Sequence, residues 1–167
     1  MSENWAGEKV VPLKDLASLV VDLKGKGLTV GLCHGCFDIL HIGHYRHFLA
    51  AKKKCDRLLV TVTPDEYVNK GPDRPIFSAH HRAELIAGLA VVDFVGVNEW
   101  PSAVETVRLL RPDRFFKGRE YAESPEEVNQ NFLIEADVVR EVGGEVVFTG
   151  GLVRSSTEAW KKLQVSL

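Results

Sequence analysis

Long hydrophobic runs are missing from this sequence. No stretch of about eighteen apolar residues occurs, so no membrane-spanning helix is predicted. The N-terminal residues also lack an apolar core behind basic residues, and we expect no signal peptide. The formal net charge is only −2, which gives no bulk attraction to a nucleic-acid backbone. Neither nucleic acid nor a membrane is therefore an expected partner.

Cysteine is also scarce, with only Cys33, Cys36 and Cys55 in the chain. An odd, low count favours a reducing compartment, and we expect the cytoplasm. Cys33 and Cys36 have CxxC spacing and are followed by His41 and His44, which leaves a zinc or redox site as an alternative. Against it, no second cysteine pair follows, Cys33 belongs to a predicted buried strand, and the next predicted helix begins several residues after Cys36.

The apolar pattern alternates between short continuous runs and runs with helical spacing. Strands are predicted over 28–33, 57–63, 93–97, 114–117 and 145–149, and helices over 12–24, 41–52, 80–89, 100–111, 124–142 and from about 155. This order predicts an α/β fold: a Rossmann-like, doubly wound domain with a five-stranded parallel sheet and helices on both faces. We expect one domain over 1–167, with 1–27 as a helical extension packed on it.

The turn after the first predicted strand opens a helix on two histidines. The first N–H groups of a helix have no intrahelical partner and point outward with the positive end of the helix dipole, which suits phosphate. His41 and His44 are three residues apart and therefore share a helical face. Gly35 and Gly43 have no side chains and would let a nucleotide approach the backbone. The turn is therefore predicted to bind phosphate groups, with two imidazoles as hydrogen-bond donors.

The ordered motifs resemble a known family. H-I-G-H at 41–44, preceded by G-C-F-D at 35–38, is similar to the HxGH nucleotidyltransferase (cytidylyltransferase-like) superfamily, which also has a C-terminal S-S-T motif. Within it, the chain most resembles the adenylyltransferase domain of ADP-heptose synthase and, more distantly, glycerol-3-phosphate cytidylyltransferase. The resemblance covers nearly the whole chain, through VTVTPDEYVNKG, RPIFSAHHRAELIAGLAVVDFV, RPDRFFKGREY, GGEVVF and RSSTEAW in the expected order.

The resemblance implies roles for individual residues. His41 and His44 would contact the triphosphate and stabilise the transition state, and Lys70 would reach the phosphates as a third catalytic residue. Nucleotide binding is implied for Gly35, Cys36, Phe37, Asp38, Gly43, Arg82, Lys117, Gly118, Ser155, Ser156 and Thr157. Acceptor binding is implied for Glu120, Tyr121 and Arg154. No residue is implied as a metal ligand.

Asp38 and Arg82 are among the positions that keep other interpretations. Asp38 is also typical of a residue that stabilises a turn, and Arg82 of a helical residue paired with Asp or Glu. In the last motif Trp160 stands where relatives have a cation, so that Arg154 or Lys161 would replace its charge.

The resemblance implies direct transfer of a nucleoside monophosphate. An acceptor phosphate oxygen would attack the α-phosphorus of ATP or CTP, pyrophosphate would leave, and Mg²⁺ would arrive with the nucleotide. The expected acceptor is a sugar phosphate such as heptose 1-phosphate, and the alternatives are glycerol 3-phosphate, another polyol phosphate or a phosphonate. A homodimer is expected from the relatives.

Two other classes of protein remain as alternatives. Class I aminoacyl-tRNA synthetases also carry a HIGH motif, but this chain is short, has no KMSKS-like loop and lacks the charge for RNA. A non-catalytic nucleotide-binding module on the same fold is distinguished by whether pyrophosphate is released.

Overall fold

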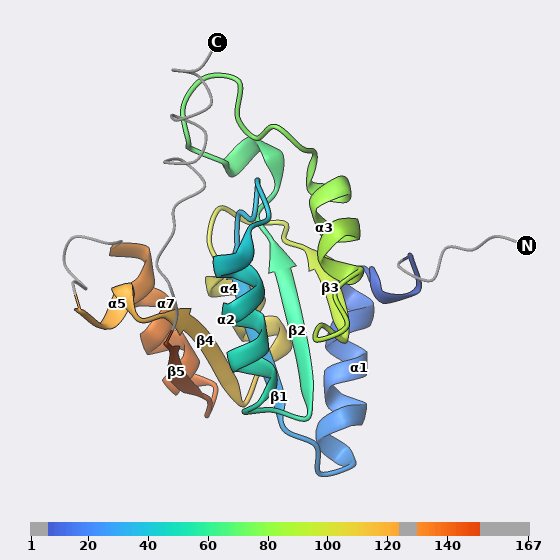
Figure 1. Cartoon of the computed structure of the whole chain (residues 1–167). Helices are drawn as coiled ribbons and strands as arrows, with labels where there is room; N and C mark the ends of the chain where they lie inside the picture. The colour runs from blue at the N-terminus through green and yellow to red at the C-terminus, as the bar shows by residue number, and fades with distance from the viewer. Residues whose placement is uncertain (1–6, 124–129, 151–167) are drawn as a thin grey trace, which may run out of the picture.

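The central sheet is parallel throughout. The computed structural model describes residues 7–123 and 130–150, and within them the strands form one sheet in the order β3-β2-β1-β4-β5 (Figure 1). Their bounds are β1 (Val30–Gly35), β2 (Arg57–Val62), β3 (Phe94–Val97), β4 (Arg114–Gly118) and β5 (Glu145–Thr149). The chain starts in the middle, moves to one edge, and returns to the other side of β1. The predicted α/β, five-stranded doubly wound sheet is confirmed.

Helices cover both faces of this sheet, as predicted (Figure 1). The α-helices are α1 (Leu13–Gly25), α2 (Ile42–Lys52), α3 (Ala79–Ala87), α4 (Val104–Leu110), α5 (Glu120–Glu123) and α7 (Gln130–Glu141). Two short 3₁₀ helices are η1 (Gly7–Lys9) and η2 (Asp65–Tyr67). None of the described helices has the length and apolar character needed to cross a membrane.

Each face of the sheet has its own apolar core. On one face, α1, α4 and α7 pack against strand residues such as Leu32, Leu59 and Phe115. On the other face, α2 and α3 pack against residues such as Val60 and Phe116. All five of these side chains are fully buried, and each contributes about 1.5–3 kcal/mol of hydrophobic free energy. Burial on both faces is why the strands are continuous apolar runs in the sequence.

Strand β1 lies two residues later than predicted, over Val30–Gly35 instead of 28–33. At its start, the Thr29 N–H donates to the Asp56 carboxylate at 2.8 Å, so that this amide belongs to a turn. At its end, the His34 ring hydrogen-bonds to Thr61 Oγ1 at 2.9 Å on the neighbouring strand. A polar residue can therefore continue this strand.

The segment before α4 is a loop where a helix start was predicted. The Asn98 side-chain amide donates to the carbonyl groups of Trp100 (2.5 Å) and Ser102 (2.9 Å). These bonds hold 98–103 outside the helix, which begins at Val104. The predicted helix over 124–142 corresponds in its described part to α7, and the one from about 155 lies outside the described residues. The short α5 was not predicted.

Gly96 allows α1 to lie directly on β3. A Cβ atom at this position would come within 2.6 Å of Leu16 Cδ1, and Leu16 is fully buried. We expect Gly96→Ala to lower the free energy of unfolding by about 1–3 kcal/mol, because the core has no room for the methyl group. The matched control is Gly25→Ala at the end of α1, where a Cβ meets nothing within 4 Å. Urea unfolding of both variants measures this, and equal stabilities would contradict the packing described.

Candidate active site

A cleft of about 590 Å³ opens at the carboxyl ends of the strands. Gly35, Gly118 and Thr149 line it from the ends of β1, β4 and β5, and Thr63 lines it directly after β2. The cleft therefore lies where the chain reverses its direction of travel across the sheet, which is the usual ligand site of such folds. The sequence-predicted residues that line it are His41, His44, Lys70, Gly35, Cys36, Phe37, Gly43, Lys117, Gly118, Glu120 and Tyr121.

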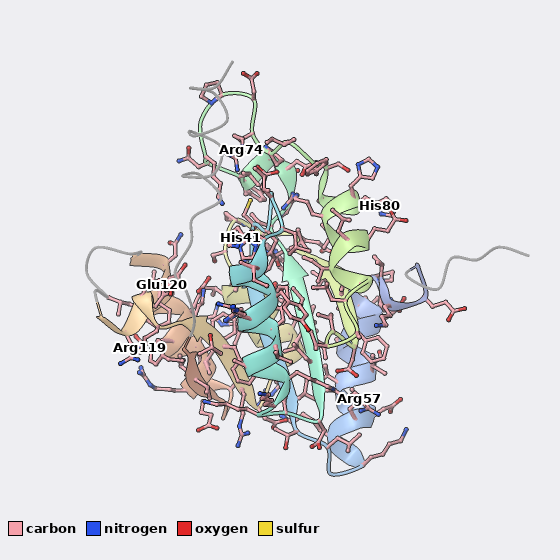
Figure 2. All side chains as sticks on the ribbon, in the orientation of Figure 1. His41, Arg57, Arg74, His80, Arg119 and Glu120 are labelled. Atoms are coloured by element: carbon pink, nitrogen blue, oxygen red, sulfur yellow. The ribbon has the colours of Figure 1, made fainter. Side chains whose placement is uncertain are left out.

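His41 caps the helix that it precedes. Its backbone is extended (φ −140°), and its Nδ1 accepts a hydrogen bond from the Gly43 N–H at 3.1 Å. Because Nδ1 is an acceptor, the neutral imidazole carries its proton on Nε2 and can donate from that atom. Figure 2 places His41 at the N-terminal end of α2, next to the carboxyl ends of the strands. The predicted helix start at the histidine motif is confirmed.

His44 stacks on His41. The two ring centroids are 3.8 Å apart with 17° between the planes. The ring centroid of Phe37 lies 5.2 Å from that of His44, and these two rings are nearly perpendicular. Burial, followed by the nearby His41, Lys70 and His47, lowers the pKa of His44 from 6.5 to about 3. Its Nδ1 is buried and has no hydrogen-bond partner among the described residues. A buried polar atom without a partner is unusual in a stable fold and is typical of a functional site.

Phe37 explains the need for Gly35. Phe37 has a positive φ of 48°, and its ring packs 5.1 Å from that of Phe48 in α2. A Cβ on Gly35 would lie 2.9 Å from the tip of the Phe37 ring. From the sequence, we expected the missing side chain of Gly35 to make room for a nucleotide. In the structure it makes room for the Phe37 ring.

Asp38 is not among the residues that line the cleft. It is 1% exposed and accepts hydrogen bonds from Arg74 Nε, from the Ile76 N–H (2.7 Å) and from the Phe77 N–H (3.3 Å). Burial raises the pKa of Asp38, but these hydrogen bonds outweigh that effect and lower it overall. Asp38 thus fastens the loop before α3, which is the turn-stabilising alternative that the sequence left open.

Arg82 is also buried behind the cleft wall, at 1% exposure. Its guanidinium donates to the carbonyl oxygens of Cys36, Thr63 (2.8 Å) and Phe77 (2.8 Å), and to the Asp65 carboxylate (2.6 Å). These contacts match the pairing with an acidic residue that the sequence also allowed, and the phosphate contact that the resemblance implied stays a prediction. Arg82 instead joins the histidine-bearing turn to the loop that carries the predicted catalytic lysine.

Lys70 and Lys117 bring positive charge to the cleft. Lys70 lines the cleft from the loop after β2, which Arg74 and Arg82 hold through ion pairs with Asp38 and Asp65. Lys117 Nζ is 2.6 Å from Glu135 Oε2, in a pair that is less than a tenth exposed. The rings of Phe115 and Tyr121 lie 4.9 and 5.0 Å from the same ammonium group.

Several polar cleft residues were not predicted from the sequence, among them His34, His47, Glu135 and Thr149. His47 follows His44 by three residues, and this spacing was a signal that could have been used. Burial is the main cause that lowers the pKa of both His34 and His47 from 6.5 to about 4. Glu135 on α7 and Thr149 on β5 reach the cleft only because the chain folds, and no local sequence pattern indicates them.

Several predicted residues are not placed. Arg154, Ser155, Ser156, Thr157, Trp160 and Lys161 lie outside the described residues. Cys33 is fully buried in β1, where burial is the main cause that raises its pKa well above 9. The residues that are described contain no group of three His, Cys, Asp or Glu side chains arranged to hold a metal ion.

Comparison with known proteins decides the family. Residues 32–162 match the cytidylyltransferase-like family, which is more than half of the chain. The chain belongs to this family. The resemblance inferred from the histidine motif is confirmed.

Two similar curated relatives are longer proteins. The bifunctional protein HldE of Granulibacter bethesdensis is 43% identical over 136 residues, which are 80% of this chain and 27% of HldE. HldE of Mesorhizobium japonicum is 37% identical over 152 residues, which are 90% of this chain and 29% of the relative. The chain thus spans less than a third of these relatives.

Two solved structures have the same fold. A lipopolysaccharide core biosynthesis protein of Thermoplasma volcanium has a TM-score of 0.60 and 26% identity, over 77% of this chain and 100% of that one. Pantoate-beta-alanine ligase of Francisella tularensis has a TM-score of 0.64 and 12% identity, over 91% of this chain and 72% of that one. At 12% identity, the second likeness concerns the fold alone.

Acid should destabilise the protein. His34, His44 and His47 have pKa values lowered to about 4, 3 and 4, whereas the same groups titrate near 6.5 in an unfolded chain. Below pH 6.5 the unfolded state therefore binds protons that the folded state does not, and stability falls as the pH falls. At pH 5 each group costs up to about 2 kcal/mol. Urea unfolding at pH 7, 6 and 5 measures this loss.

The control for this pH dependence is a histidine on the surface. His47→Gln should flatten the dependence, and His80→Gln should leave it unchanged because His80 is exposed on α3. A free energy of unfolding that stays constant from pH 7 to pH 5 would contradict the neutral, buried state of these rings.

Replacement of Arg82 separates a loop-fastening role from a phosphate contact. Arg82→Lys keeps the charge but cannot reach all the acceptors around the guanidinium, so we expect the free energy of unfolding to fall by about 2 kcal/mol or more without any nucleotide present. Arg46→Lys on the exposed side of α2 is the control. If Arg82→Lys keeps its stability and loses only nucleotide affinity, the result would favour a phosphate contact for Arg82.

Proposed function

We propose that this protein transfers a nucleoside monophosphate from a nucleoside triphosphate to a sugar phosphate and releases pyrophosphate. The observation that carries the proposal is the stacked pair of His41 and His44 on the wall of the cleft, at the start of α2. A helix start with a donor Nε2–H beside it is a site for anionic oxygen atoms. Family membership supports the same reaction class.

The reaction needs positioning and charge stabilisation. An oxygen of the acceptor phosphate attacks the α-phosphorus, a new P–O bond forms, and the bond to the β-phosphate oxygen breaks in line with the attack. The acceptor phosphate is ionised at neutral pH, so no general base is required. His41 donates from Nε2 to a triphosphate oxygen, while Lys70 on the opposite loop balances the charge of the departing pyrophosphate. Each preorganised donor is commonly worth about 3 kcal/mol in such a transition state.

Mg²⁺ belongs to the proposed substrate. Nucleoside triphosphates carry the ion on their phosphates, where it keeps most of its water ligands and needs few from protein. Glu120 lines the cleft and is a carboxylate that this complex can meet, whereas Glu135 is already paired with Lys117. We therefore treat the nucleotide and its metal as one ligand.

The acceptor is proposed to be a sugar 1-phosphate of the heptose class, with ATP as the donor. The HldE relatives and the lipopolysaccharide core biosynthesis protein support a sugar-related substrate. The resemblance of the sequence motifs to the adenylyltransferase domain of ADP-heptose synthase supports ATP. CTP with a polyol phosphate or a phosphonate is the alternative within the same chemistry. A cytoplasmic homodimer remains a prediction, which gel filtration tests for its oligomeric part.

The direct experiment is a pyrophosphate-release screen. ATP, CTP, GTP and UTP are each incubated with Mg²⁺ and a panel of sugar 1-phosphates, glycerol 3-phosphate, other polyol phosphates and phosphonates. Release that requires both a nucleotide and a sugar 1-phosphate is the expected result. Release only with a polyol phosphate would change the acceptor class. Nucleotide binding without release from any pair would favour a non-catalytic module.

Loss of either histidine should abolish most of the activity. His41→Ala and His44→Ala are each expected to lower kcat by about two orders of magnitude or more, because the transition state loses a preorganised donor. His80→Ala is the matched control, since Figure 2 places His80 on α3, pointing away from His41. Steady-state pyrophosphate release measures all three. Turnover of both α2 variants at the wild-type rate would refute the proposed site.

A further inference from the structure

His47 lies in the cleft without a role in the reaction described above. Together with His41 and His44 it forms a row of histidines at intervals of three residues, and all three rings line the same cleft. His47 is about 4.5 Å farther along the axis of α2 than His44, given a rise of about 1.5 Å per residue. It therefore lies next to the phosphate-binding pair, on the side away from the helix start.

A chain of hydrogen bonds orients the His47 ring. Its Nδ1 is 2.5 Å from Thr149 Oγ1 at the end of β5, and the same hydroxyl donates to the carbonyl oxygen of Lys117 on β4 at 3.3 Å. A carbonyl oxygen can only accept, so a Thr149 hydroxyl that donates to it has no proton left for His47. In that arrangement the proton of the shorter contact belongs to Nδ1 of His47.

This arrangement leaves Nε2 of His47 with a lone pair. Burial and then the Lys117 ammonium lower the pKa of His47 to about 4, so the ring is neutral at pH 7. No hydrogen bond to Nε2 is found within residues 7–123 and 130–150. In a neutral ring protonated on Nδ1, this nitrogen accepts and cannot donate. It therefore differs from Nε2 of His41, which carries a proton.

We propose that His47 is a specificity-determining residue whose Nε2 accepts a hydrogen bond from a hydroxyl group of the acceptor, and that Thr149 is the positioning residue that fixes its tautomer. This inference rests on the proposed function. An ionised phosphate oxygen has no proton to give and is repelled by a lone pair, whereas a sugar hydroxyl is a donor. The histidine row thus divides the cleft: His41 donates to phosphate, and His47 accepts from the sugar.

The surroundings of His47 fit this division. Thr149 is 4% exposed and Lys117 is 7% exposed, so the hydrogen bonds of Thr149 to His47 and to Lys117 are shielded from water. Glu135, whose Oε1 accepts from the Ala103 N–H at 3.1 Å and whose Oε2 faces Lys117, adds further acceptor oxygens to the same side. An acceptor without the matching hydroxyl would leave Nε2 dry and unpaired, a state that commonly costs a factor of about 10 to 100 in kcat/KM.

The first test is a spectroscopic one on the free protein. Nitrogen NMR of the histidine rings at pH 7 should report His47 with the proton on Nδ1 and a bare Nε2. Thr149→Val keeps the branched shape of the strand residue and removes the hydroxyl, so we expect the tautomer of His47 to shift towards protonation on Nε2. A wild-type ring that is protonated on Nε2, or one that does not respond to Thr149→Val, would overturn the inference.

The second test is a mutant cycle with deoxy substrates. The probes are the sugar 1-phosphate that turns over fastest in the pyrophosphate screen and its monodeoxy analogues. For one hydroxyl position, the kcat/KM of the wild type should be about 10- to 100-fold lower with the deoxy analogue than with the full substrate. The kcat/KM of His47→Phe should be nearly the same with both substrates. Thr149→Val should show an intermediate loss, and His80→Phe should behave as the wild type.

The outcomes separate this inference from the proposed function. Equal losses in the wild type and His47→Phe at every hydroxyl position would overturn the role of His47 and leave the transferase reaction intact. Absence of pyrophosphate release from every pair would overturn both. If His47→Phe does not fold, the cycle between wild type and Thr149→Val still decides the matter, because that substitution is close to isosteric.

Discussion

The five strands run in one direction, and this constraint places their carboxyl ends at a single edge of the sheet. Residues from the ends of β1, β2, β4 and β5 meet there although they are far apart in sequence. Because β1 lies in the middle and the chain leaves it on both sides, the edge is hollowed above β1. The cleft, the start of α2 and both lysines follow from this topology.

Within that frame, buried polar groups hold the walls of the cleft. Arg74 and Arg82 join the loop after β2 to the turn after β1, and the ion pair of Lys117 with Glu135 joins β4 to α7. Removing one partner of a buried ion pair commonly costs about 3–5 kcal/mol, since it leaves an unpaired charge. Such groups fix a geometry more than they add stability, and here the fixed geometry is that of two histidines, a lysine loop and a polar wall.

The sequence was sufficient for the fold and for the position of the histidine pair, because apolar periodicity and helix-start chemistry are local signals. Arg82 and Asp38 show what local signals miss. The sequence allowed both a ligand role and a structural role, and only the folded chain shows the acceptors around Arg82 and the amides around Asp38. Glu135 and Thr149 could not be predicted, since their partners are distant in the chain; His47 and Thr149 are 102 positions apart. The roles implied for the remaining residues are still predictions.

The central claim is that the start of α2 holds a triphosphate for transfer of its innermost phosphate. The most direct measurement is a crystal structure of the full chain with Mg²⁺ and a triphosphate analogue that has a methylene group between the α- and β-phosphorus atoms. We predict an α-phosphate oxygen within hydrogen-bond distance of His41 Nε2, with the sugar and base along the carboxyl ends of the strands. A triphosphate bound away from both His41 and His44 would contradict it.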